Sequence, residues 1–126
     1  MIGKIRVIIA GSRRYEDYEK LKEVVGNIVN PLLLHGQVEL VSGGATGADR
    51  LSERFAREYN YPIKVFPADW NKYGNSAGPI RNKEMAVYAK EANLGMLIAF
   101  PLGESRGTRN MIQTAKNMTM PVFVVE

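Results

Sequence analysis

The chain has 126 residues, of which 45% are hydrophobic and 24% charged, with a formal net charge of +4 at pH 7. Such a balance is typical of an ordinary globular protein, and no run reaches the roughly 18 consecutive apolar residues of a membrane span. The lack of cysteine excludes disulfides, and a single histidine, His35, excludes a histidine metal cluster. We therefore expect one domain over residues 1–126 without a metal site and, since no signal-peptide pattern opens the chain, a cytoplasmic protein.

The first half of the chain alternates short apolar runs with amphipathic segments. The β-branched run 5–10 predicts a strand, and residues 17–30 repeat apolar side chains at steps of three and four, which predicts a helix. Pro31 is expected to end or kink that helix. Residues 38–42 predict a second strand and residues 46–60 a second helix with one apolar face.

The second half continues the alternation. The expected elements are strands 63–66, 94–100 and 121–125 and helices 79–91 and 105–117. Residues 67–78 are expected to be irregular, and a connection of this length is usually functional or mobile. The order predicts an α/β fold with a doubly wound parallel sheet and helices on both faces, in which ligands bind beyond the carboxyl ends of the strands.

Three predicted strand-to-helix loops share glycine, small residues and a hydroxyl group. The candidate ligand-binding residues in them are Gly11, Ser12 and Arg13, then Ser42, Gly43, Gly44, Ala45, Thr46 and Gly47, then Ser105, Gly107 and Thr108. Glycine lets backbone N–H groups approach an anion, and helix starts add free donors. Each loop alone is equally explained as a tight turn, and none carries a P-loop or dinucleotide fingerprint. Their recurrence at three strand ends favours a phosphate site.

The positive charge is concentrated near these loops. Six of the nine arginines lie in or beside glycine-bearing loops, namely Arg13, Arg14, Arg50, Arg81, Arg106 and Arg109. A nucleic-acid binder more often shows a basic stripe or charge run, so this placement favours a compact anionic ligand.

A further group of candidates could contact the rest of such a ligand. Asp49 could bond a ribose hydroxyl or orient Arg50, or it could simply complement a helix dipole. Arg81, expected in the first turn of its helix, is unfavourable for the dipole and therefore asks for an anionic partner. Asn82 could bond a base or phosphate, or be solvated at the surface. Trp70 and Tyr73 could stack on a base, or pack the long loop onto the sheet.

The motifs, taken in order, resemble a known family. They are Ala10-Gly11-Ser12-Arg13, Ser42-Gly43-Gly44-Ala45, Gly47-Ala48-Asp49-Arg50, Ala68-Asp69-Trp70, Tyr73-Gly74, Ala77-Gly78-Pro79, Arg81-Asn82, Ala99-Phe100 and Ser105-Arg106-Gly107-Thr108. Together they resemble the YspA, cpYpsA-related branch of the SLOG superfamily over almost the whole chain, and they add Gly78 to the candidate ligand-binding residues. The resemblance implies a Rossmann-like nucleotide-binding fold with strand order 3-2-1-4-5 and a homo-oligomer, a dimer or larger. Relatives include the Lonely Guy phosphoribohydrolases and the DNA-processing protein DprA.

One departure from those relatives bears on catalysis. The phosphoribohydrolases carry a catalytic glutamate shortly after a Gly-Thr pair, and alignment on Gly107-Thr108 places Met111 there. The relatives also carry an arginine and a methionine on the third helix, and Arg81 and Met85 match this pair only loosely. The resemblance therefore implies a phosphate-binding half of the site without its acid–base half.

Three functions follow as hypotheses. The first is binding or sensing of a nucleotide-derived phosphorylated small molecule without turnover. The second is a phosphoribohydrolase-like N-glycosidase with a displaced carboxylate, its catalytic candidates being Asp49, Asp69 and Arg81, with Glu53 as a further carboxylate. The third, less favoured, is single-stranded DNA binding as in DprA. We expect no obligatory cofactor and no membrane partner, although nearby carboxylates leave room for a phosphate-bridged magnesium ion.

Overall fold

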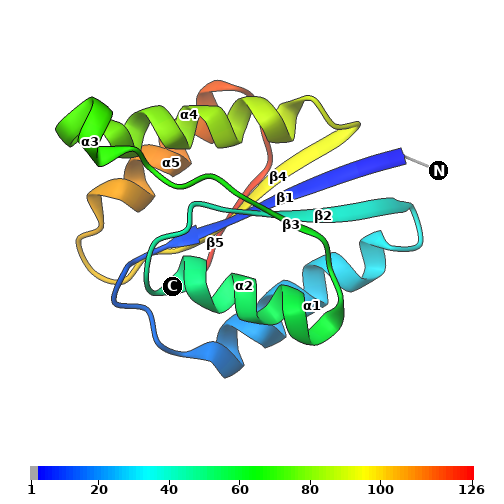
Figure 1. The fold of residues 1–126 in the computed structure, drawn as a ribbon. Helices are drawn as coiled ribbons and strands as arrows, with labels where there is room; N and C mark the ends of the chain where they lie inside the picture. Colours follow the sequence, from blue (N-terminus) through cyan, green and yellow to red (C-terminus); the bar gives the residue numbers. More distant parts are fainter. Residues whose placement is uncertain (1–2) are drawn as a thin grey trace.

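The computed structural model describes residues 3–126, and its centre is a five-stranded parallel sheet (Figure 1). The strands are β1 (Gly3–Gly11), β2 (Gly36–Ser42), β3 (Ile63–Val65), β4 (Leu94–Phe100) and β5 (Val122–Val124). They are ordered β3-β2-β1-β4-β5, which confirms the order that the family resemblance implied. The two central strands, β1 and β4, pair from Ile5 with Leu94 to Gly11 with Phe100.

Two helical layers cover the sheet. Four long helices form them: α1 (Tyr18–Leu32), α2 (Ala48–Tyr59), α4 (Ala77–Lys90) and α5 (Arg106–Asn117). Successive side chains of a strand point to opposite faces. Ile5, Val7 and Ile9 of β1 therefore join the core with α1 and α2, whereas Ile8 packs with α4 and α5 on the other face.

The segment expected to be irregular contains regular structure. A single turn of helix, α3 (Trp70–Tyr73), runs into a 3-10 turn (Gly74–Ser76), and α4 starts at Ala77. The side chain of Asp69 accepts a hydrogen bond from Lys72 N–H and so caps α3. The prediction of an irregular 67–78 holds only for residues 67–69 and was wrong for the rest, because a capped turn of four residues is too short to show periodicity.

The first helix also runs slightly further than expected. Pro31 lies inside the last turn of α1, which ends at Leu32. None of the helices within residues 3–126 has both the length and the apolar character needed to cross a membrane.

The strand order creates a crevice at one edge of the sheet. The chain leaves β1 towards α1 on one face and leaves β4 towards α5 on the other, and β1 and β4 are neighbours. Their carboxyl ends therefore diverge into loops that open away from each other (Figure 1), which is where ligands bind in open α/β sheets.

Candidate functional site

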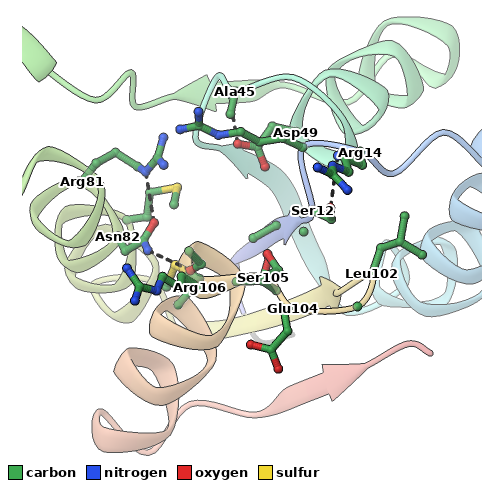
Figure 2. Close-up of a pocket in the computed structure, with 18 residues that line it drawn as sticks. Ser12, Arg14, Ala45, Asp49, Arg81, Asn82, Leu102, Glu104, Ser105 and Arg106 are labelled. Atoms are coloured by element: carbon green, nitrogen blue, oxygen red, sulfur yellow. Dashed lines mark hydrogen bonds between the residues drawn. The ribbon is translucent and has the colours of Figure 1, made fainter. Parts of the chain in front are cut away.

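A cavity of about 470 Å³ opens between the loops after β1 and β4 (Figure 2). Residues from the first turn of α2 and from α4 complete its wall. The residues that line it are Ala10, Gly11, Ser12, Arg13, Arg14, Ala45, Asp49, Arg81, Asn82, Met85, Leu102, Gly103, Glu104, Ser105, Arg106, Gly107, Thr108 and Met111. This volume lies in the range of small-molecule sites.

The loop after β1 is held by its own backbone. Ser12 donates its N–H to Phe100 O of β4 (3.0 Å), and its carbonyl accepts from Ala48 N–H at the start of α2 (3.1 Å). The neighbouring Gly47 has φ +76°, and a Cβ there would overlap the backbone of Ser12 and Arg13. Only glycine fits this close approach, so Gly47 lets α2 begin directly against the β1 loop.

The loop after β2 folds around side chains of α2. Gly44 N–H donates to Ser42 Oγ (3.1 Å), and Ala45 N–H donates to Asp49 Oδ2 (3.1 Å). Ser42 Oγ in turn donates to Glu53 Oε2 (2.9 Å). The N–H groups of Gly44 and Ala45, both candidate ligand-binding residues, thus have hydrogen-bond partners inside the protein. Of residues 42–47, only Ala45 lines the cavity.

Asp49 is the buried carboxylate of the site, with 5% of its surface exposed. Burial raises its pKa to about 6, opposed by the Ala45 N–H and by the charge of Arg81. Oδ2 accepts from Ala45, whereas Oδ1 has no hydrogen-bond partner within the described residues, and the carboxylate points into the cavity (Figure 2). Asp49 can therefore accept a hydrogen bond from a ligand.

Arg81 faces Asp49 across the cavity and is fixed by the backbone. Its Nη1 donates to Gly43 O and, at 3.4 Å, to Phe66 O, while Nε donates to Asn82 Oδ1 (3.0 Å). Burial lowers the pKa of this guanidinium. A Cβ on Gly43 would lie 2.5 Å from Nη1, so any larger residue here would force the guanidinium to shift.

Arg81 lies two residues deeper in its helix than expected. It is the fifth residue of α4, which begins at Ala77, so the argument from an unfavourable helix dipole in the first turn was wrong. The partners of the guanidinium are the backbone carbonyls of Gly43 and Phe66, and not an anion as expected. Its Nη2 has no partner among residues 3–126 and remains available to a ligand.

The start of α5 forms the opposite wall. Ser105 is the N-cap, and its hydroxyl contacts that of Thr108 (2.6 Å). The N–H groups of Arg106, Gly107 and Thr108 belong to the first turn, which has no intrahelical acceptors. They therefore offer donors and the positive end of the helix dipole to the cavity.

The charges of the lining are mostly positive and mostly uncompensated. In the described part of the chain, Arg13, Arg14, Arg81 and Arg106 form no ion pair, whereas Glu104 is paired with Arg109 (3.0 Å). The Arg13 guanidinium lies 5.5 Å from the centroid of the Trp70 ring. An anionic ligand would thus meet an excess of positive charge, although Asp49 offsets part of the charge of Arg81 and Arg13.

The structure brings part of the predicted set together. The predicted ligand-binding residues that line the cavity are Gly11, Ser12, Arg13, Ala45, Asp49, Arg81, Asn82, Ser105, Gly107 and Thr108. Those outside the lining are Ser42, Gly43, Gly44, Thr46, Gly47, Arg50, Trp70, Tyr73 and Gly78. Asn82 is buried rather than solvated, with 4% exposed.

The catalytic candidates separate in the same way. Asp49 and Arg81 line the cavity, whereas Asp69 caps α3 and Glu53 bonds Ser42. Within residues 3–126, no cluster of three or more His, Asp or Glu side chains is arranged to hold a metal ion.

Sequence reasoning did not assign several lining residues to the site. These are Ala10, Arg14, Met85, Leu102, Gly103, Glu104, Arg106 and Met111. Arg14 and Arg106 belong to the arginines near the glycine-bearing loops, and this position in the sequence could have identified them as site residues. Met85 and Met111 are buried at 1% exposure, and they supply apolar floor that resembles ordinary core in a sequence.

Comparisons with known proteins agree with this architecture. Residues 5–73 match the sequence model of the YspA, cpYpsA-related SLOG family. The Gene 61 protein of Mycobacterium phage D29 is 34% identical over an alignment 123 residues long, and the match covers 94% of this chain and 94% of that protein.

Two solved structures share the fold. The DNA processing protein A (DprA) of Streptococcus pneumoniae superposes with a TM-score of 0.70 at 14% identity over 97% of this chain, which spans 50% of that protein. A structural genomics target, TM1055, superposes with a TM-score of 0.62 at 17% identity, covering 94% of this chain and 72% of that one.

Proposed function

Because the chain belongs to the YspA, cpYpsA-related SLOG family, we propose that it binds a nucleotide or nucleotide-derived phosphorylated small molecule in the cavity beyond β1 and β4. The family and the Rossmann-like fold support a nucleotide-related role in general. The observation that carries the proposal is one cavity that combines the open start of α5 with arginines that form no ion pair within residues 3–126.

The phosphate would lie against the first turn of α5. The N–H groups of Gly107 and Thr108 supply oriented donors, and Arg81 Nη2 supplies charge from the facing wall. Asp49 would accept a hydrogen bond from a ribose hydroxyl through Oδ1. We therefore place the phosphate at the start of α5 and not at Gly44, whose N–H is bonded to Ser42.

Equilibrium binding tests the proposal. Isothermal titration with the four common nucleoside monophosphates, ADP-ribose and a thymidine oligonucleotide separates the ligand classes. We expect a saturable response to one of the phosphorylated small molecules. Failure of every ligand would refute the proposal, and an oligonucleotide response that weakens steeply with salt would favour nucleic-acid binding instead.

A pair of matched variants localises the response. Arg106 lines the cavity and Arg57 lies on the exposed side of α2; both are exposed and neither forms an ion pair in the described residues. Arg106→Ala should weaken binding about tenfold, since a charge-assisted hydrogen bond contributes about 1.5 kcal/mol or more. Arg57→Ala removes the same charge and should leave the affinity unchanged.

A second candidate is a phosphoribohydrolase-like N-glycosidase. Asp49 favours it, because this buried carboxylate faces the cavity and its pKa, raised to about 6, suits proton transfer near neutral pH. Met111, which aligns with the catalytic glutamate of the relatives and lines the cavity, cannot act as an acid or base.

Product analysis decides between binding and turnover. Incubation with nucleoside monophosphates, followed by chromatography for free base, should show release that Asp49→Asn abolishes and Asp69→Asn leaves intact. Absence of release from every purine and pyrimidine substrate would exclude this candidate and leave the binding proposal standing.

A further inference from the structure

The side chain of Asn82 connects two parts of the cavity wall that come from different helices. It is buried, with 4% of its surface exposed, on α4 next to Arg81. Its Oδ1 accepts from Arg81 Nε (3.0 Å), and its Nδ2 donates to Gly107 O (3.2 Å) and to Asn110 Oδ1 (2.9 Å). Both hydrogens of the amide are therefore occupied inside the protein, so this NH2 group is not available to a ligand.

The first contact orients Arg81. The guanidinium has five N–H donors in a rigid plane. Nη1 bonds two backbone carbonyls, and Asn82 takes the donor on Nε. These bonds fix the plane of the group and leave the Nη2 donors free. Without Asn82, the guanidinium could turn about its carbonyl contacts.

The second contact acts on the start of α5. The carbonyl of Gly107 and the N–H of Thr108 belong to one peptide group. A hydrogen bond to the carbonyl polarises that peptide and strengthens its N–H as a donor. In a helix the N–H points towards the N-terminus, which here is the cavity. The Asn82–Gly107 bond thus reinforces a donor on the far wall.

We propose that Asn82 is a positioning residue of the cavity, which couples the orientation of the Arg81 guanidinium to the donor strength of the Thr108 N–H. The role in ligand recognition rests on the proposed function, whereas the coupling itself can be measured in the ligand-free protein. Asn82 acts through these two groups and does not touch the ligand through its amide NH2.

Nuclear magnetic resonance of the full chain tests the coupling directly. In Asn82→Leu, the Thr108 amide proton should move upfield and the Arg81 Nε–H should exchange faster with water. Asn82→Asp keeps the acceptor for Arg81 Nε but lacks the donors, so it should move the Thr108 signal and preserve the protected Arg81 signal. A purely structural role would not produce this split, and Asn82→Asp also serves if the leucine variant does not fold.

Titration with inorganic phosphate and with AMP then tests recognition. Asn82→Leu should weaken binding of the probe about tenfold. Asn110→Ala, which cuts only the contact between the two asparagines, should change it less than twofold. Wild-type positions of both signals in the Asn82 variants, or unchanged affinity, would overturn the inference. If the wild type binds neither probe, the titration is repeated with the nucleotide that gives a response in the isothermal panel. If no ligand of that panel binds, the proposed function fails, and the ligand-free signals still decide the coupling.

Discussion

Replacement of Gly107 by alanine should raise stability and lower ligand affinity at the same time. Gly107 lies in the first turn of α5 and lines the cavity, and a Cβ there would meet no protein atom within 4 Å. Alanine therefore enters without strain and gains about 0.5–1 kcal/mol over glycine in a helix. For a domain of this size that gain corresponds to a Tm increase of about 2–5 °C.

The same methyl group intrudes on the proposed phosphate position. If the ligand approaches the N–H groups of Gly107 and Thr108 closely, the new Cβ lies in its path. We expect the loss of one charge-assisted contact, which weakens binding about tenfold or more. Thermal unfolding and isothermal titration on the same preparation measure the two effects.

Gly26→Ala is the matched control. Gly26 lies within α1, outside the cavity, and a Cβ there would meet Asn30 Nδ2 at 3.5 Å and Phe55 at 4.0 Å, which are ordinary contacts. It should give a similar gain in Tm without a change in affinity. If Gly107→Ala raises Tm and binds the ligand as tightly as the wild type, the phosphate does not approach the start of α5, and this part of the account is refuted.

Three further changes have defined outcomes. Burial raises the pKa of Asp49 from 3.8 to about 6, so the folded state binds the proton of this carboxyl group more tightly than the unfolded state does. Protonation of Asp49 therefore stabilises the fold. This stabilisation is fully present below about pH 4 and is lost as the pH rises through 6. In urea titrations, the free energy of unfolding should thus fall by about 3 kcal/mol over that range relative to Asp49→Asn, taking 1.36 kcal/mol per pKa unit, and a constant difference would contradict the reasoning. Trp70 is the sole tryptophan and lies beside Arg13. A ligand that contacts Arg13 should therefore change the fluorescence of Trp70, and Arg13→Ala should abolish this change. Gly47→Ala should cost about 3 kcal/mol or more, because φ is +76° and the Cβ would overlap the Ser12 loop, and near-wild-type stability in urea would show that the loop can shift.

The strands and long helices could be predicted because their signals are local. The predicted fourth strand coincides with β4 (Leu94–Phe100), and the predicted fourth helix starts at the N-cap of α5. Apolar runs between glycine-bearing loops fix such elements without tertiary information. The capped turn α3 lacks the length that a periodic signal needs.

The candidate site was predictable as an edge of the sheet, but not as a set of partners. Sequence placed the glycine loops at strand ends, yet it could not show that Gly44 N–H bonds to Ser42 or that Asp49 receives Ala45 N–H. Nor could it show that Arg81 reaches across to the carbonyl of Gly43. These contacts join residues on different elements, and only the folded chain decides which donors remain for a ligand.

Chemical-shift mapping of the wild-type protein tests the central claim most directly. The amides of Arg106, Gly107 and Thr108 line the cavity together with Ala45, whose N–H is held by Asp49. During titration with each phosphorylated small molecule of the binding panel, we expect saturable shifts at these four amides and at the Arg81 Nε–H for the one that binds. The absence of saturable shifts with every one of these ligands, or shifts confined to residues outside the cavity, would contradict the claim.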